Sequence, residues 1–210
     1  MVAKNKRTGP RTETLERRKE IVRAAAEVFG IRGYYNGSLA EIAEQVGMTH
    51  AGILHHFGSK DHLLLEVLKY RDSSDVEHLE AQHIPDGKEF FQHLVKTAFS
   101  NEKRVGLVQT YAVLSAESVT EDHPGREYFQ QRYNTLRAEA AHALRVMCEQ
   151  EGITEPETID RASASVLAVM DGLQVQWLLD PNDVELAKAS EFAIEAIVTA
   201  VLSPGASHLD

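Results

Sequence analysis

Hydrophobic side chains recur along this chain every three or four residues, the period of an α-helix that buries one face. The first such stripe predicts a helix over residues 15–32, ended by Gly33, and consists of Ile21, Ala24, Ala25, Val28 and Phe29. Period-two alternation bounded by hairpin turns does not occur, and no internal repeat is found. We therefore expect an all-α protein of about nine helices.

The next segment predicts two short helices joined by a tight turn. Ser38 can cap the first helix, and Glu41 three residues later completes a capping box. Gly47 stands where a helix ends in the left-handed conformation, and Thr49 can cap a second helix over residues 50–56. Two short helices hinged at a glycine form the unit that lays its second helix in a DNA major groove.

The remaining stripes predict six more helices. The fourth helix starts at Lys60 after a Gly-Ser break, extends to about residue 82, and is followed by the turn Pro85-Asp86-Gly87. Five further helices are expected over residues 88–101, 104–119, 125–151, 156–179 and 182–202. This pattern divides the chain into a basic, mobile arm (1–14), a head (15–75), a helical body (76–203) and a short tail (204–210).

Charge is distributed unevenly over these parts. The chain holds 22 Lys and Arg against 32 Asp and Glu, a net charge of −10. Residues 1–60 hold ten basic and six acidic residues, a net of +4, which leaves −14 on residues 61–210. A basic head on an acidic body fits a local footprint for DNA phosphates, and on charge alone it fits equally a solvated, Arg-rich first helix.

Other chemistry is sparse. Cys148 is the only cysteine, so no disulfide forms within the chain and a reducing compartment is expected. With no signal peptide and no run of about 20 apolar residues, we expect a cytoplasmic protein without a membrane segment. Four histidines between His50 and His62 lack the spacing to hold one ion from one helix face, and no nucleophile–base set or phosphate loop is present. We therefore expect no metal, no cofactor and no enzymatic activity.

The head resembles the DNA-binding domain of the TetR family of transcriptional regulators over residues 15–75. The order and spacing of the helix ends agree with that family, ending in Phe-x-Ser-Lys before the fourth helix. The residues that carry the resemblance are Ile21, Ala25, Phe29, Gly33, Tyr34, Ser38, Ile42, Ala43, Val46, Gly47, Phe57, Ser59, Lys60 and Leu63. The body resembles the family only in its length and helical segments.

The resemblance implies a set of DNA-contacting residues. In the recognition helix and its cap these are Thr49, His50, Gly52, His55 and His56. Around it they are Arg17, Arg18, Ser38 and Lys60, aimed at the DNA backbone or the adjacent minor groove. The family usually has Tyr where this chain has Leu54, so the phosphate contact of that hydroxyl is lost or passes to His55.

The resemblance also implies a homodimer and an effector pocket. The last two helices would pair with their copies in a four-helix bundle, with interface residues Val166, Leu173, Phe192, Ile197 and Val201. The pocket for a small apolar or aromatic effector would be lined by Phe90, Leu94, Tyr111, Leu114, Phe129, Tyr133, Met170, Gln174 and Trp177. Each of these aromatic residues taken alone also fits a role as core filling.

We thus expect a dimeric regulator, a repressor of a palindromic double-stranded DNA operator that is released by a small molecule. Two alternatives remain from the sequence. One is a helical regulator with no effector, which a solidly packed body would favour. The other is a small-molecule binder or enzyme on the same scaffold, which would need a convergent acid–base or nucleophile set in the pocket.

Overall fold

The computed structural model describes residues 10–76, 85–154 and 157–203, and within these ranges the chain is helical without a strand. The nine helices of this part are α1 (Pro10–Asn36), α2 (Leu39–Gln45), α3 (His50–Phe57), α4 (Lys60–Val76), α5 (Gly87–Asn101), α6 (Val105–Glu117), α7 (Arg126–Gln150), α8 (Ile159–Leu179) and α9 (Leu186–Leu202). The all-α prediction is confirmed.

Helix ends differ from the predicted ones by a few residues. Helix α1 begins at Pro10, inside the stretch expected as a mobile arm, and a proline at the first helical position is favourable because its missing N–H is not needed there. Helix α9 begins four residues later than expected, since Asp180 accepts a hydrogen bond from Asn182 N–H and forms a turn. The continuation of α4 to residue 82, the arm up to residue 9 and the tail from 204 lie outside the described residues.

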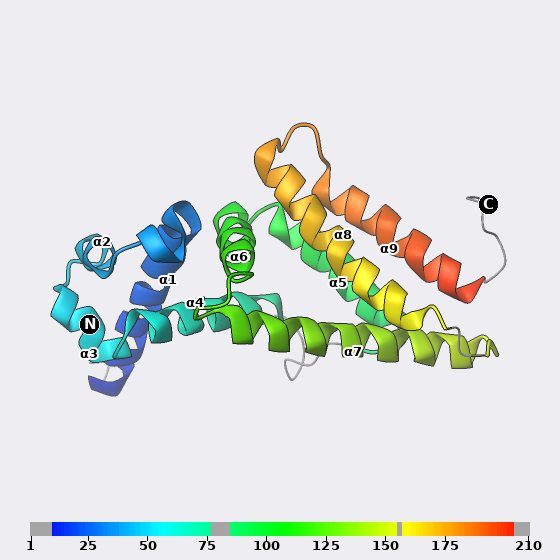
Figure 1. The fold of residues 1–210 in the computed structure, drawn as a ribbon, viewed down its shortest axis with the longest axis horizontal. Helices are drawn as coiled ribbons and strands as arrows, with labels where there is room; N and C mark the ends of the chain where they lie inside the picture. The colour runs from blue at the N-terminus through cyan, green and yellow to red at the C-terminus, as the bar shows by residue number, and fades with distance from the viewer. Residues whose placement is uncertain (1–9, 77–84, 155–156, 204–210) are drawn as a thin grey trace, which may run out of the picture.

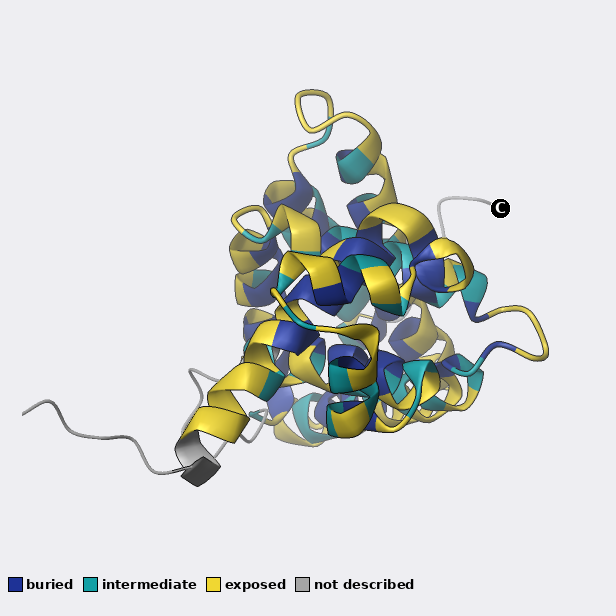
Figure 2. Ribbon diagram, turned by 90° about the vertical axis from the view of Figure 1, so that its left-hand side faces the viewer, coloured by how far each residue is buried: buried dark blue, intermediate teal, exposed yellow. Residues whose placement is uncertain are grey.

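The molecule is elongated, with α1–α3 at one end and α7, α8 and α9 reaching to the other (Figure 1). Helix α4 leads from the head toward the body, and α6 stands between the two halves, packed lengthwise on α1. Figure 2 shows that buried residues face the spaces between helices while exposed residues cover the outer surfaces.

The helix pair of the head is built by its caps. Ser38 Oγ accepts the Glu41 N–H at 3.1 Å, and Thr49 Oγ1 accepts the Gly52 N–H at 3.1 Å. The Glu41 carboxylate lies 3.6 Å from Arg32 of α1, so it ties α2 to α1 as well. Gly47 has φ 64°, the left-handed conformation expected of it.

Two main hydrophobic cores hold the structure. The core of the head contains Phe29, Ile42, Ile53 and Leu63, and it also includes Tyr111 and Leu114 of α6 and Phe129 of α7. The core of the body lies between α5, α7, α8 and α9. Because two body helices supply side chains to the core of the head, the two parts share one packed junction.

Helix α8 is the one described helix that is long and apolar enough, by length and composition, to cross a bilayer. It contacts α6, α7 and α9 along its length and buries Ser163 and Gln174. Those contacts are typical of a central helix in a globular protein.

Candidate DNA-contacting surface and ligand cavity

Helix α3 presents one side to solvent and anchors the other. Ile53 and Phe57 are buried in the core of the head, which fixes how the helix projects. Thr49, His50 and His55 are exposed, and Gly52 and His56 are half-buried. The predicted recognition residues are therefore all at least partly accessible on one short helix with a capped start.

His56 lies where its charge is disfavoured. Burial lowers the pKa of its imidazole, and the neighbouring His55, Arg18 and Arg17 lower it further by charge repulsion. A phosphate placed beside these three basic side chains would remove part of that repulsion. The pair His55 and His56 is thus suited to contacting an anion.

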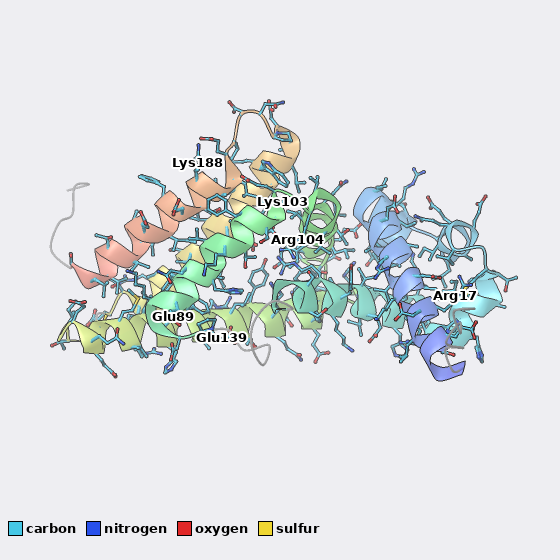
Figure 3. All side chains as sticks on the ribbon, turned by 180° about the vertical axis from the view of Figure 1, so that it is seen from behind. Arg17, Glu89, Lys103, Arg104, Glu139 and Lys188 are labelled. Atoms are coloured by element: carbon cyan, nitrogen blue, oxygen red, sulfur yellow. The ribbon has the colours of Figure 1, made fainter. Side chains whose placement is uncertain are left out.

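The two arginines predicted to reach DNA lie in different surroundings. Arg17 is exposed at the head end of the molecule (Figure 3), with its guanidinium 2.8 Å from Glu20 and 3.4 Å from Val46 O at the end of α2. Arg18 is half-buried: it donates to His56 O and stacks 4.3 Å above the Phe57 ring. Arg18 therefore holds α3 onto α1, while Arg17 faces solvent.

Lys60 opens α4 beside the turn that follows α1. Its ammonium donates to Tyr35 O at 3.3 Å and sits 4.4 Å from the centre of the Tyr34 ring. Burial lowers the pKa of this ammonium, and attraction to Asp61 and Glu117 acts in the opposite direction. Lys60 is half-buried and carries three N–H donors, of which Tyr35 O takes one. Ser38 is exposed at the start of α2, near the same turn.

A cavity of about 440 Å³ lies in the body, enclosed by α4 to α8. Its apolar part includes Leu94, Leu136, Leu167 and Met170. Its polar part is a connected network of charged and phenolic groups contributed by α4, α6, α7 and α8. A volume and lining of this kind suit a small organic molecule.

The network begins at Asp72 of α4. Its carboxylate lies 2.5 Å from Arg132 Nη1 and 3.4 Å from Arg71 Nη1, and it accepts a hydrogen bond from Tyr128. Both guanidinium groups also stack over the Tyr111 ring, at 4.3 Å for Arg71 and 5.3 Å for Arg132. The two guanidinium groups of the cavity therefore share one carboxylate and one aromatic ring.

The network continues to α8. The hydroxyls of Tyr111 and Tyr133 lie 3.3 Å apart, and Tyr133 donates to Asp171 at 2.5 Å. Burial raises the pKa of the Asp171 carboxyl, against the Tyr133 hydrogen bond and the nearby Arg71 and Arg132. One turn further along α8, Gln174 is 4% exposed, and its buried Oε1 has no hydrogen-bond partner among the residues that the structure describes.

Five of the nine residues predicted for the effector pocket line this cavity: Leu94, Tyr111, Tyr133, Met170 and Gln174. The other four lie elsewhere. Phe90 packs in the core of the body, Leu114 and Phe129 in the core of the head, and Trp177 in a small cluster with Val108 and Leu186.

The charged lining of the cavity was not predicted from the sequence; it consists of Arg71, Asp72, Arg132, Glu139 and Asp171. One signal was available for Asp171, because it is a carboxylate inside the apolar stretch Val166–Leu179 of α8. The two arginines carried no such signal, since they lie on amphipathic helices that also have exposed basic residues. Figure 3 shows Glu139 on α7, in the body half and far from Arg17.

A second hollow of about 760 Å³ lies between α5, α7 and α9. None of the predicted effector residues lines it, and its rim carries Lys88, Lys96, Glu191 and Glu195. The residues that line this second hollow come from none of the helices α1 to α4. The first cavity, in contrast, is lined in part by α4 and α6, which also pack in the core of the head. The described residues contain no cluster of His, Cys, Asp and Glu able to hold a metal ion.

The residues predicted for a dimer interface divide between core and surface. Val166 and Val201 are buried in the core of the body, and Leu173 and Ile197 are half-buried against neighbouring helices. Phe192 is 76% exposed on α9, and Val175 and Leu179 of α8 are also exposed. Gly172 and Ala196 have no side chain or a small one, so no bulky side chain projects from the helix surface at these two positions.

Comparison with known proteins agrees with this geometry. Residues 21–67 match the family described as "Bacterial regulatory proteins, tetR family". Residues 89–202, more than half of the chain, match the family described as "BetI-type transcriptional repressor, C-terminal". The two matches cover the head and the body separately.

Individual relatives show the same division. The HTH-type transcriptional repressor AcnR of Corynebacterium jeikeium is 39% identical over 56 residues, which is 27% of this chain and 30% of that protein. The HTH-type transcriptional regulator BetI 1 of Chromohalobacter salexigens is 25% identical over 186 residues, covering 86% of this chain and 88% of that protein.

The solved structure of a transcriptional regulator from Saccharomonospora viridis in complex with choline has a TM-score of 0.68 and 23% identity, covering 87% of this chain and 96% of the other. That likeness establishes the fold. With the family matches to both parts and the helix pair exposed at the end of the head, the chain belongs to the TetR family of DNA-binding transcriptional regulators.

Proposed function

We propose that this protein is a homodimeric repressor of a palindromic operator, released when a small organic molecule fills the cavity enclosed by α4 to α8. The observation that carries the proposal is that α4 and α6 belong to both sites. Each helix lines the cavity, through Arg71 and Tyr111, and each packs in the core of the head. A ligand that shifts either helix changes the position of α3.

The cavity favours an effector with an apolar part and at least one polar or charged group. Leu94, Leu167 and Met170 offer the apolar contact, Asp171 adds a carboxylate to the lining, and Gln174 offers a buried amide oxygen that has no hydrogen-bond partner among the described residues. A purely apolar effector would leave that oxygen unsatisfied. The choline complex of the regulator from Saccharomonospora viridis supports a small polar ligand in this fold.

The DNA arm of the proposal is tested by selecting binding sites from a random pool of double-stranded DNA with the full chain. We expect a palindrome whose half-sites lie about 34–36 Å apart, one helical turn, and an affinity that falls steeply with salt. Failure to enrich any sequence, or enrichment of a single unpaired half-site, would contradict it.

The effector arm is tested on the selected DNA by fluorescence anisotropy, with choline, phenethylamine and decanoate as probes. We expect at least one probe to release the DNA. A Gln174→Leu variant, which removes the buried polar group offered to the ligand without filling the cavity, should bind the DNA with wild-type affinity and respond more weakly. If no probe alters wild-type binding and none shifts its melting temperature, the regulator without an effector is favoured.

A further inference from the structure

The junction between α1 and α6 contains a set of hydrogen bonds that neither the DNA surface nor the cavity explains. Helix α1 breaks at Gly33, where φ is 74° and ψ is 174°. Beside this break, Gln109 of α6 donates to Gly30 O at 3.1 Å, and Glu117 Oε2 accepts the Tyr34 N–H at 2.7 Å. Side chains of α6 thus pair with backbone groups on both sides of the break.

The fit around Glu117 is close. A Cβ atom added at Gly33 would lie 2.1 Å from Glu117 Oε1, and one added at Gly30 would lie 3.3 Å from the Thr110 backbone. The Thr110 hydroxyl lies 2.8 Å from Ala26 O, one turn earlier on α1. Two glycines therefore let α6 lie directly on α1, with the Glu117 carboxylate against the broken end.

Tyr34 carries this contact to the start of α4. Its hydroxyl donates to Asp61, and its ring supports the Lys60 ammonium at 4.4 Å. The next residue, Tyr35, accepts the Lys60 hydrogen bond through its carbonyl. Lys60 is therefore held by the same backbone turn, Tyr34–Tyr35, whose Tyr34 N–H donates to Glu117.

The loop after α6 also contacts the Tyr34–Tyr35 turn. His123 is buried and its ring packs at 5.2 Å against Tyr34 and 5.5 Å against Tyr35. Its Nδ1 accepts the Gly125 N–H, which fixes the ring in place. The body therefore contacts the Tyr34–Tyr35 turn with both a carboxylate and an aromatic ring.

We infer that Glu117 is a positioning residue for DNA binding, which acts through Tyr34 to hold Lys60 and the first turn of α4 where a DNA phosphate is bound. The inference rests on the proposed function in that it assumes DNA binding by the head. Helix α6 also brings Tyr111 to the cavity, so a ligand that moves α6 would move this support as well. DNA binding by Glu117 variants can be measured without an effector, so the role of Glu117 is tested separately from release by a ligand.

The test compares Glu117 variants with wild type on the DNA selected from the random pool. Glu117→Ala removes the acceptor, and Glu117→Asp keeps the charge but is one methylene too short to reach the Tyr34 N–H. Both should weaken DNA binding by up to about tenfold, the effect of losing one hydrogen bond. Glu117→Gln keeps an oxygen at the same reach and should stay within about twofold of wild type. Glu121→Ala, an exposed neighbour of equal charge, is the matched control.

A double-mutant cycle separates positioning from general loss of structure. Lys60→Ala should weaken DNA binding and lower the salt dependence by about one phosphate contact. If Glu117 acts through Lys60, adding Glu117→Ala to Lys60→Ala should cost little more. Wild-type affinity of Glu117→Ala and Glu117→Asp would overturn the inference, and so would full additivity with Lys60→Ala. Equal weakening by Glu117→Gln and Glu117→Ala would also overturn the inference. The negative charge of Glu117, and not its hydrogen bond with the Tyr34 N–H, would then support DNA binding.

Discussion

Gly33 meets two requirements at one position of the chain. Its backbone takes φ 74°, which side-chain-bearing residues rarely adopt, and its missing Cβ leaves the space that the Glu117 carboxylate fills. The sequence predicted that a helix would end at this glycine, because glycine is the residue that tolerates such a conformation. It did not predict the carboxylate, since Glu117 is 84 residues away and no local pattern joins the two.

Gly33→Ala should lower the free energy of unfolding by at least about 2 kcal/mol, because the backbone strain adds to the clash with Glu117. Gly106→Ala is the matched control: no atom lies within 4 Å of the added Cβ, and the residue is in helix α6. There the substitution should raise stability by about 0.5–1 kcal/mol. Urea unfolding at one fixed protein concentration measures both, and equal effects of the two substitutions would refute the account of Gly33.

We expect His123 to make the junction sensitive to acid. Burial lowers the pKa of its imidazole, with Glu117 and Asp61 acting in the opposite direction, and protonation of Nδ1 would break the hydrogen bond from Gly125. Because the folded pKa lies below the unfolded value of 6.5, the unfolded state binds more protons as the pH falls through 6.5. The stabilisation is therefore present above that pH and declines below it.

We expect wild type to lose more stability between pH 7.5 and pH 5.5 than His123→Gln, whose amide does not titrate. Urea unfolding at the two pH values measures the difference. An identical loss in both proteins would show that His123 does not contribute to the pH dependence.

At the scale of helices, local signals predicted the elements and non-local contacts made the cavity. Ser38, Gly47 and Thr49 act within a few residues of themselves, so their caps and turns could be predicted from the sequence. The charged lining brings together Asp72 of α4, Arg132 of α7 and Asp171 of α8, and its partners are set by packing. Phe129 and Leu114 illustrate the same limit, because an apolar residue on a helix fits equally the core of the head or a pocket wall.

The ion pair of Arg132 with Asp72 should stabilise the contact of α4 with α7. Its two atoms lie 2.5 Å apart, with the Arg132 side chain 16% exposed and the Asp72 side chain 31% exposed, so solvent screens the pair only in part. Arg132→Met should cost about 3 kcal/mol, at the low end for a broken buried pair because Arg71 still faces Asp72. Lys188→Ala breaks the exposed pair with Glu185 and should leave stability nearly unchanged. Equal losses in urea unfolding would show that burial does not distinguish the two pairs.

At the scale of the whole molecule, α8 and α9 carry apolar side chains that no other part of the described chain covers. The family resemblance implied a dimer interface on these helices, and the structure places Phe192, Val175 and Leu179 at the surface while Val166 and Val201 pack inside the chain. Periodicity reveals which positions are apolar. It does not tell which face meets the same chain and which remains open.

Phe192→Glu should therefore shift the protein from dimer to monomer in light scattering after size exclusion. It should also weaken binding to the palindrome, because each head then binds its half-site alone. Ile31→Glu changes a similarly exposed side chain on α1 of the head and should leave the protein dimeric. A dimeric Phe192→Glu protein would place the interface elsewhere.

The core shared by head and body sets where this protein can be cut and recombined. Tyr111, Leu114 and Phe129 complete the hydrophobic core around α1 and α4, so a fragment ending with α4 would expose the surface that these three side chains cover. A chimaeric regulator that takes its operator preference from this chain should therefore inherit α6 and the first turns of α7 along with the head. A chimaera joined at the end of α4 would carry the DNA-contacting helices without the side chains of α6 and α7 that complete their hydrophobic core.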